Sequence, residues 1–216
     1  EAGGFAPLIA LAEESRKSLG GEGGALGEGR KTGRKTGRKT GRSTNRGSSN
    51  ARDAEEQKRM DKRMIIAATN IARWPDQRCQ DAIREGGGIP VIVSLLVGGP
   101  DNELAAAATQ SLRQVTLENE TNCDALREAG GIRWLILLLA GRAAHPVAID
   151  AAATLAQVAN TSPTNQDAIH EAGGTRMLIN FLSANVESQG LVWAARCLTH
   201  LSRDNATNRA FICEQQ

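Results

Sequence analysis

The densest group of chemically functional side chains in this 216-residue sequence is a basic run near its N-terminal end. Three copies of Gly-Arg-Lys-Thr occupy 29–32, 33–36 and 37–40. Such a run binds phosphate backbones, acidic tails or anionic surfaces by releasing counterions, and without interleaved aromatic residues it offers no platform for stacking bases. The candidate polyanion-binding residues are Arg30, Lys31, Arg34, Lys35, Arg38, Lys39 and Arg42.

The segment around this run, 14–53, differs in composition from the rest of the chain. It holds 11 Lys/Arg against 4 Asp/Glu and almost no apolar residues. Ordering it would cost about 1–2 kcal/mol per residue with little burial in return, so we predict a disordered insert. A nuclear-localisation signal and a solvated loop with incidental affinity for polyanions are alternative interpretations of its charge.

Residue types that carry out catalysis or bind metals are present but scattered. His145, His170 and His200 are far apart, and none stands at ligand spacing with a Cys, Asp or Glu. The four cysteines form no Cys-x-x-Cys pair, which is typical of a reduced intracellular setting. No apolar run approaches the roughly 18 residues that a membrane helix needs. The sequence therefore predicts no enzyme, metal site, cofactor, small-molecule substrate or membrane contact.

The elements that position any functional side chains in this sequence belong to a repeat with a period of 43 residues. Glu-Ala-Gly-Gly stands at 128–131 and again at 171–174, with Glu-Gly-Gly-Gly at 85–88. A fixed period in this range is typical of stacked units that bury their apolar faces against each other. The apolar columns at this spacing are Ile83, Leu126, Ile169 and Ile212; Ile92, Leu135 and Leu178; Leu95, Leu138 and Phe181; Leu96, Leu139 and Leu182; and Leu112, Leu155 and Leu198.

Each repeat is predicted to contain three helices. A short helix ends at the glycines, an apolar helix follows over 132–140 or 175–183, and a longer one follows over 146–160 or 188–202. The tandem glycines allow the left-handed turn between the first two helices. Pro90 suits a first helical turn, where no amide hydrogen is needed.

This pattern resembles the armadillo repeat. Asn122 is followed by Ala-Leu, Glu-Ala-Gly-Gly-Ile, a pair of leucines and Ala-Ala-x-x-Leu ending at Leu155, and a similar order runs from Asn165 to Leu198. The resemblance covers 1–13, as a partial repeat, and 54–216. It implies an all-α, right-handed α-solenoid whose third helices line a concave groove that binds extended peptides or partner proteins. Because both ends cut through a repeat, we expect the chain to belong to a longer array.

The resemblance also indicates which positions face the groove. In relatives of the nuclear-import adaptor type, a Trp and an Asn flank the central Leu of the third helix, but neither stands there in this chain. Polar residues take these places, and an amide side chain can bond to both the N–H and the C=O of a peptide. An exposed, solvated helix face is the alternative interpretation. The candidate groove residues are Arg73, Gln110, Gln114, Gln157, Arg196 and His200.

The sequence thus favours a non-catalytic interaction scaffold for a protein or extended peptide. We expect it in the cytoplasm and, with the insert as a signal, also in the nucleus. Polyanion or nucleic-acid binding through the insert is one alternative. The repeat region of a larger multidomain protein, such as a ubiquitin ligase, is another. Salt separates groove binding from polyanion binding, because only the latter collapses as ionic strength rises.

Overall fold

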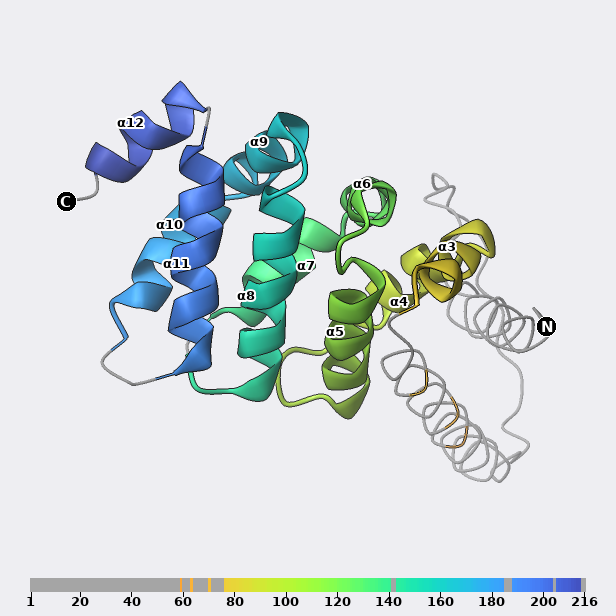
Figure 1. Ribbon diagram of the computed structural model, residues 1–216. Coiled ribbons are helices and arrows are strands. Elements are labelled where there is room, and N and C mark those ends of the chain that lie inside the picture. The colour runs from red at the N-terminus through yellow and green to blue at the C-terminus, as the bar shows by residue number, and fades with distance from the viewer. Residues whose placement is uncertain are drawn as a thin grey trace, which may run out of the picture.

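The computed structural model describes residues 76–140, 143–184, 188–203 and 205–214, together with residues 59, 63 and 70. Every regular element in these ranges is an α-helix, as Figure 1 shows. The predicted partial repeat 1–13 and the predicted insert 14–53 lie outside the described residues, as does most of the helical segment expected from 54 to 74.

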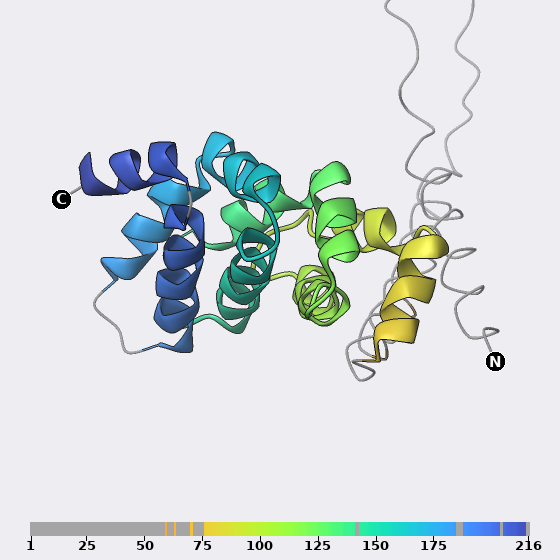
Figure 2. The ribbon, with the colours of Figure 1, turned by 45° about the horizontal axis from the view of Figure 1, so that its top comes forward.

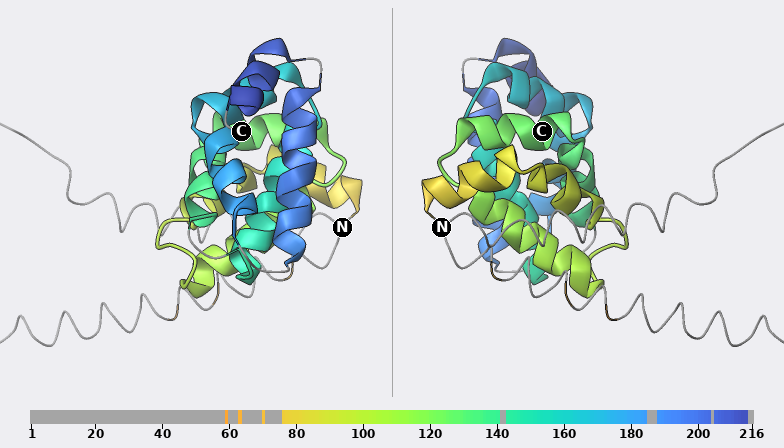
Figure 3. Two further views of the ribbon diagram at one scale, coloured as in Figure 1. Left: turned by 90° about the vertical axis from the view of Figure 1, so that its left-hand side faces the viewer. Right: turned by 90° about the vertical axis from the view of Figure 1, so that its right-hand side faces the viewer.

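Three kinds of helix recur in order along the chain. Figure 1 shows the third helices side by side, and Figure 2 shows the repeats following one another from α3 to α12. Figure 3 views the same repeats from the two ends, one behind another. The first helices are α3 (Gln77–Glu85), α6 (Glu120–Glu128), α9 (Pro163–Glu171) and α12 (Ala206–Glu214); the second are α4 (Gly88–Ser94), α7 (Gly131–Leu138) and α10 (Gly174–Leu182); the third are α5 (Glu103–Val115), α8 (Pro146–Ala159) and α11 (Gln189–Ser202). The predicted all-α solenoid of three-helix repeats is confirmed.

The turn between first and second helix is the same in each repeat. Gly87, Gly130 and Gly173 have φ values of 71°, 74° and 80°, the left-handed region that glycine adopts without a steric penalty. Each is followed at once by the glycine that begins the second helix. The turn predicted from the tandem glycines is therefore confirmed.

Polar side chains cap the first helices at the same 43-residue spacing. The side-chain oxygen of each residue accepts a hydrogen bond from a backbone N–H in the first turn, which satisfies a donor that has no partner within the helix. These residues are Asp76, Asn119, Ser162 and Asn205, with bond lengths of 3.1, 3.1, 3.3 and 3.0 Å. Asn102 and Ser188 cap third helices in the same way, and His145 caps α8 through its ring nitrogen Nδ1, which accepts from Val147 N–H at 3.3 Å.

The core runs along the array, formed by most of the predicted apolar columns. Leu126, Leu135 and Leu155 are fully buried, and Leu96 and Leu139 are each 1% exposed. The prediction is wrong at Leu182, which is 37% exposed although it belongs to the column of Leu96 and Leu139. The reason is stacking, because no further second helix packs over α10 among the described residues.

Consecutive first helices are also joined by hydrogen bonds from arginine to asparagine. The bonds are Arg84 Nη1 to Asn122 Oδ1 at 3.1 Å and Arg127 Nε to Asn165 Oδ1 at 2.8 Å. At the next repeat the arginine is replaced by His170, whose Nδ1 lies 3.1 Å from Thr175 Oγ1. Asn208 Oδ1 is consequently buried without a hydrogen-bond partner among the described residues.

Candidate functional site

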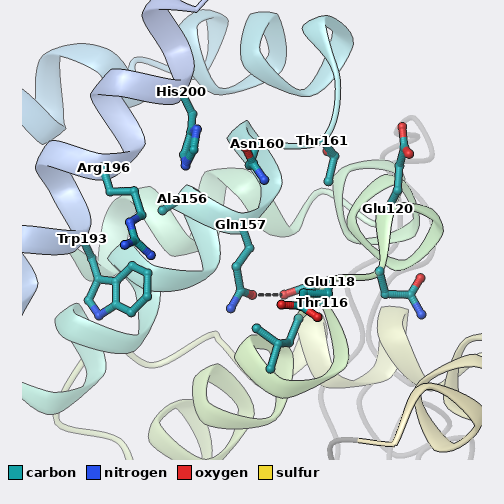
Figure 4. A pocket seen from close by; sticks show the side chains of 12 residues that line it. Thr116, Glu118, Glu120, Ala156, Gln157, Asn160, Thr161, Trp193, Arg196 and His200 are labelled. Atoms are coloured by element: carbon teal, nitrogen blue, oxygen red, sulfur yellow. Dashed lines mark hydrogen bonds between the residues drawn. The ribbon is translucent and has the colours of Figure 1, made fainter.

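A hollow of about 400 Å³ opens on the surface of the third helices. It lies between α8, α11 and the loop that joins α5 to α6, as the close view in Figure 4 shows. The loop contributes residues 116–119, α6 contributes Glu120, and α8 contributes the side chains at its C-terminal end. Trp193, Arg196 and His200 of α11 form the remaining side.

The side of the hollow formed by α11 carries an indole that two arginines approach. The Arg196 guanidinium lies 4.9 Å from the centroid of the Trp193 ring, and the Arg113 guanidinium lies 5.6 Å from it. Cations are attracted to the face of an indole ring within about 6 Å. Arg113 also forms an ion pair of 2.7 Å with Asp150. Trp193 is therefore an oriented, half-buried aromatic surface rather than a freely rotating side chain.

Gln157 lies between the two sides of the hollow in Figure 4. Its Oε1 accepts a hydrogen bond of 2.7 Å from Thr116 Oγ1, which is on the facing loop. Because this bond uses the carbonyl end of the amide, its NH₂ end is left to donate to a ligand.

His200, which lines the hollow, has a lowered pKa. Burial lowers the pKa of this imidazole below its usual value of 6.5, and the nearby charges of Arg203 and Arg196 lower it further. His200 Nδ1 is shielded from solvent and has no hydrogen-bond partner among the described residues. At neutral pH the ring is therefore uncharged and offers one N–H donor.

Three of the six candidate groove residues come together at this hollow. Gln157, Arg196 and His200 line it. Gln110 is exposed and Gln114 is half-buried on α5, outside the lining. Arg73 lies outside the described residues, as do all seven basic residues of the insert: Arg30, Lys31, Arg34, Lys35, Arg38, Lys39 and Arg42.

Sequence reasoning missed Trp193 and the loop. Trp193 stands five residues before the central Leu198 and not two, so a search at the adaptor-type position passes over it. Its place on the same helix as Arg196, three residues earlier, could have identified it. Nothing comparable indicates the loop, where Glu118 has a φ of 53° despite having a side chain.

Two of the cysteine thiols, those of Cys123 and Cys197, are buried in the core. The Cys123 thiol is fully buried, and burial raises its pKa to about 12, so it stays protonated at neutral pH. Burial also raises the pKa of Cys197. The described residues contain no group of three or more His, Cys, Asp or Glu side chains arranged to hold a metal ion. Within the same residues, no helix has the length and apolar character to cross a membrane.

No protein-family model matches the chain, and no curated protein matches it. Solved structures do. An engineered protein, Northeast Structural Genomics Consortium target OR329, is similar with a TM-score of 0.64 and 27% identity, covering 69% of this chain and 60% of its own. A designed armadillo repeat protein in complex with the peptide (KR)4 has a TM-score of 0.62 and 22% identity, covering 69% and 61%.

An armadillo-repeats-only protein from Plasmodium falciparum is similar with a TM-score of 0.54 and 24% identity, covering 63% of this chain and 58% of its own. The chain thus spans about three-fifths of the length of each of these three structures. Two of them are armadillo repeat proteins by description, and their likeness agrees with the 43-residue period and the three-helix order. The chain has the armadillo repeat fold.

Proposed function

We propose that this chain is a binding scaffold that holds an extended segment of a partner protein along the surface of α5, α8 and α11. The hollow is the observation that carries the proposal. It combines an indole face, an amide and a guanidinium on adjacent third helices, and such groups pack against a peptide and hydrogen-bond to it. The designed armadillo repeat protein in complex with the peptide (KR)4 supports it, because a similar fold there carries a peptide ligand.

The spacing of the third helices indicates how long the bound segment is. Packed helices lie about 8–10 Å apart, and an extended chain covers about 3.3–3.6 Å per residue. Because α8 packs against both α5 and α11, a ligand that crosses all three helices needs about six residues. Gln114 and Gln157 stand at the same register on α5 and α8, so each could bond to the main chain of such a segment.

A library of random 12-residue peptides, displayed and selected on the immobilised chain, tests the proposal. Two variants remove the groove groups: Gln157→Ala and Trp193→Ala. Arg133→Ala is the control, because Arg133 is an exposed side chain on α7, away from the hollow. Helical circular dichroism verifies that each variant is folded, which matters most for Trp193 since it also packs against the core.

We expect Gln157→Ala to weaken the selected peptides about threefold to tenfold, the effect of one hydrogen bond. Trp193→Ala should weaken them more, because it also removes the aromatic surface, and Arg133→Ala should leave the Kd unchanged. The proposal is overturned if no peptide is enriched on the folded chain. Peptides that bind both groove variants as tightly as the unmodified chain would overturn it too.

A further inference from the structure

The charged groups around the hollow are divided between its two sides. Arg196 and His200 of α11 line one side, and Arg203 follows at the end of the same helix. Glu118 and Glu120 are on the opposite side, in the loop between α5 and α6 and at the start of α6. Figure 4 shows Arg196 and Glu118 on different sides of Gln157. A bound segment therefore meets a cationic side and an acidic side within one hollow.

Arg196 is the cation on which the inference depends. Its side chain is exposed, and the ion pairs among the described residues do not include it. Arg113, which also lies near Trp193, is already neutralised by Asp150. A guanidinium stacked on an indole keeps the N–H groups in its plane available, in a fork that matches a carboxylate. Arg196 is thus oriented by Trp193 without being neutralised.

His200 adds a second donor on the same side, one helical turn further along α11. Its Nδ1 is buried without a partner, so Nε2 is the ring nitrogen left for a ligand. A donor one turn from a guanidinium suits an acceptor with two oxygens, since each oxygen can bond to a different side chain.

We propose that the hollow binds a side-chain carboxylate, from an Asp or Glu of the bound segment, between Arg196 and His200. This inference rests on the function proposed above, because the carboxylate belongs to the peptide that lies along the third helices. The ligand class is a segment with a lone acidic residue. An acidic run is disfavoured, because its second carboxylate would approach Glu118 and Glu120 across the hollow.

The test uses the same random 12-residue library, followed by synthetic copies of the enriched peptides with amidated C-termini. Amidation leaves side chains as the only carboxylates. Each Asp is replaced by Asn and each Glu by Gln, and the Kd of every peptide is measured on the unmodified chain, on Arg196→Gln and on Arg133→Gln. Arg133 serves as the matched control because it is an exposed arginine on the second helix α7.

We expect one acidic position to recur among the enriched peptides. Its replacement by the amide should weaken binding about tenfold or more on the unmodified chain and on Arg133→Gln, as expected for hydrogen bonds to a charged group. On Arg196→Gln the same replacement should change the Kd less than twofold. A cycle of this kind isolates the pairwise interaction from general effects of either change.

Three results would overturn the inference. Enriched peptides could lack an acidic residue, the amide replacement could weaken binding equally on Arg196→Gln, or binding could require a free C-terminal carboxylate. If those peptides still depend on Trp193 and Gln157, the proposed function stands and the carboxylate site alone fails. If no peptide depends on Trp193 and Gln157, the proposed function fails as well.

Discussion

Gly173 and Gly174 are neighbours in the sequence, but each must be glycine for a different structural reason. Gly173 has a φ of 80°, and a Cβ added there would meet nothing within 4 Å. Gly174 begins α10, where an added Cβ would lie 2.6 Å from Ile169 Cγ2, 2.7 Å from the Ile169 carbonyl oxygen and 3.0 Å from Ile136 Cδ1 of the preceding repeat. The first glycine is needed for its backbone angle and the second for space.

Asn and Ala substitutions separate these two requirements. A left-handed backbone costs an ordinary residue about 1–2 kcal/mol, whereas Asn adopts it more readily, so Gly173→Asn should cost less than about 1 kcal/mol. At Gly174 the obstacle includes a helical carbonyl that cannot move aside. Overpacking a core position costs about 1–3 kcal/mol, and Gly174→Ala should lower the free energy of unfolding by an amount at or above the upper end of that range. Gly173→Ala should fall between them.

Urea unfolding followed by helical circular dichroism measures the three free energies of unfolding. For a chain of this size, each 1 kcal/mol corresponds to about 2–4 °C in Tm, so thermal melts offer a second readout. Gly131→Ala is a useful comparison, because its Cβ would lie 3.0 Å from two side-chain carbons and 3.1 Å from a carbonyl oxygen, a milder overlap than at Gly174. If Gly173→Asn destabilises the chain as much as Gly174→Ala, the assignment of angle to one glycine and space to the other is wrong.

Four further predictions follow from the same packing and charges. Leu139→Ala should lower the free energy of unfolding by about 2–5 kcal/mol. Leu182→Ala should lower it by clearly less, because Leu182 stands at the same register but is 37% exposed. Equal losses in urea unfolding would contradict the stacking explanation. His170→Arg should raise the free energy of unfolding by about 0.5–1.5 kcal/mol, because it gives Asn208 Oδ1 a hydrogen-bond partner. Arg127→His should lower the free energy of unfolding, because it removes the bond to Asn165. An unchanged Tm for both variants would contradict the role of the arginine–asparagine bond. Burial, Arg203 and Arg196 lower the pKa of His200 below 6.5, so the unfolded chain binds a proton at this residue more readily than the folded chain does. The free energy of unfolding should therefore fall as the pH drops below about 6.5. Urea midpoints measured at pH 7.5 and 5.5 should show this fall, and His200→Gln should reduce it. Deletion of 30–42 should abolish any binding of the chain to duplex DNA. With the insert intact, a plot of the logarithm of that affinity against the logarithm of salt concentration should have a slope of about −6, and undiminished binding without the insert would place the site elsewhere.

The features that could be predicted from the sequence are those with a local cause. Tandem glycines mark a turn because only glycine adopts its backbone angle freely, so the helix boundaries near Gly130 and Gly173 were predictable to within one or two residues. The buried columns were predictable because every repeat must cover its neighbour. Both arguments require only the identity of a residue and its distance along the chain.

The features that were missed depend on which side chains meet across repeats. The exposure of Leu182 follows from what packs over α10, and the orphaned oxygen of Asn208 follows from the replacement of an arginine by His170 one repeat earlier. The capping residues were a different omission. Asp76, Asn119 and Ser162 share a spacing and a preference for helix starts, so the sequence could have identified them.

The internal repeat separates positions that stay the same in every repeat from positions that vary. Positions that build the fold hardly change from one repeat to the next: the left-handed glycines stand at 87, 130 and 173, and the central leucines of the third helices at 112, 155 and 198. The positions on either side of that leucine do change, and their exposure changes with them: Ala153 is fully buried, whereas Gln110 and Arg196 are exposed. Two residues before each central leucine stand Gln110, Ala153 and Arg196, and two residues after stand Gln114, Gln157 and His200.

A position that only had to stay solvated could accept any polar residue. The change at α11, however, places Arg196 and His200 together, beside Trp193 and against an uncharged Gln157. That combination gives one end of the third-helix surface a positive charge that α8 does not provide at the same register. Under the proposed function, a ligand that crosses both helices would be held by amides on one side and selected by charge on the other, and this asymmetry would fix its direction along the third helices.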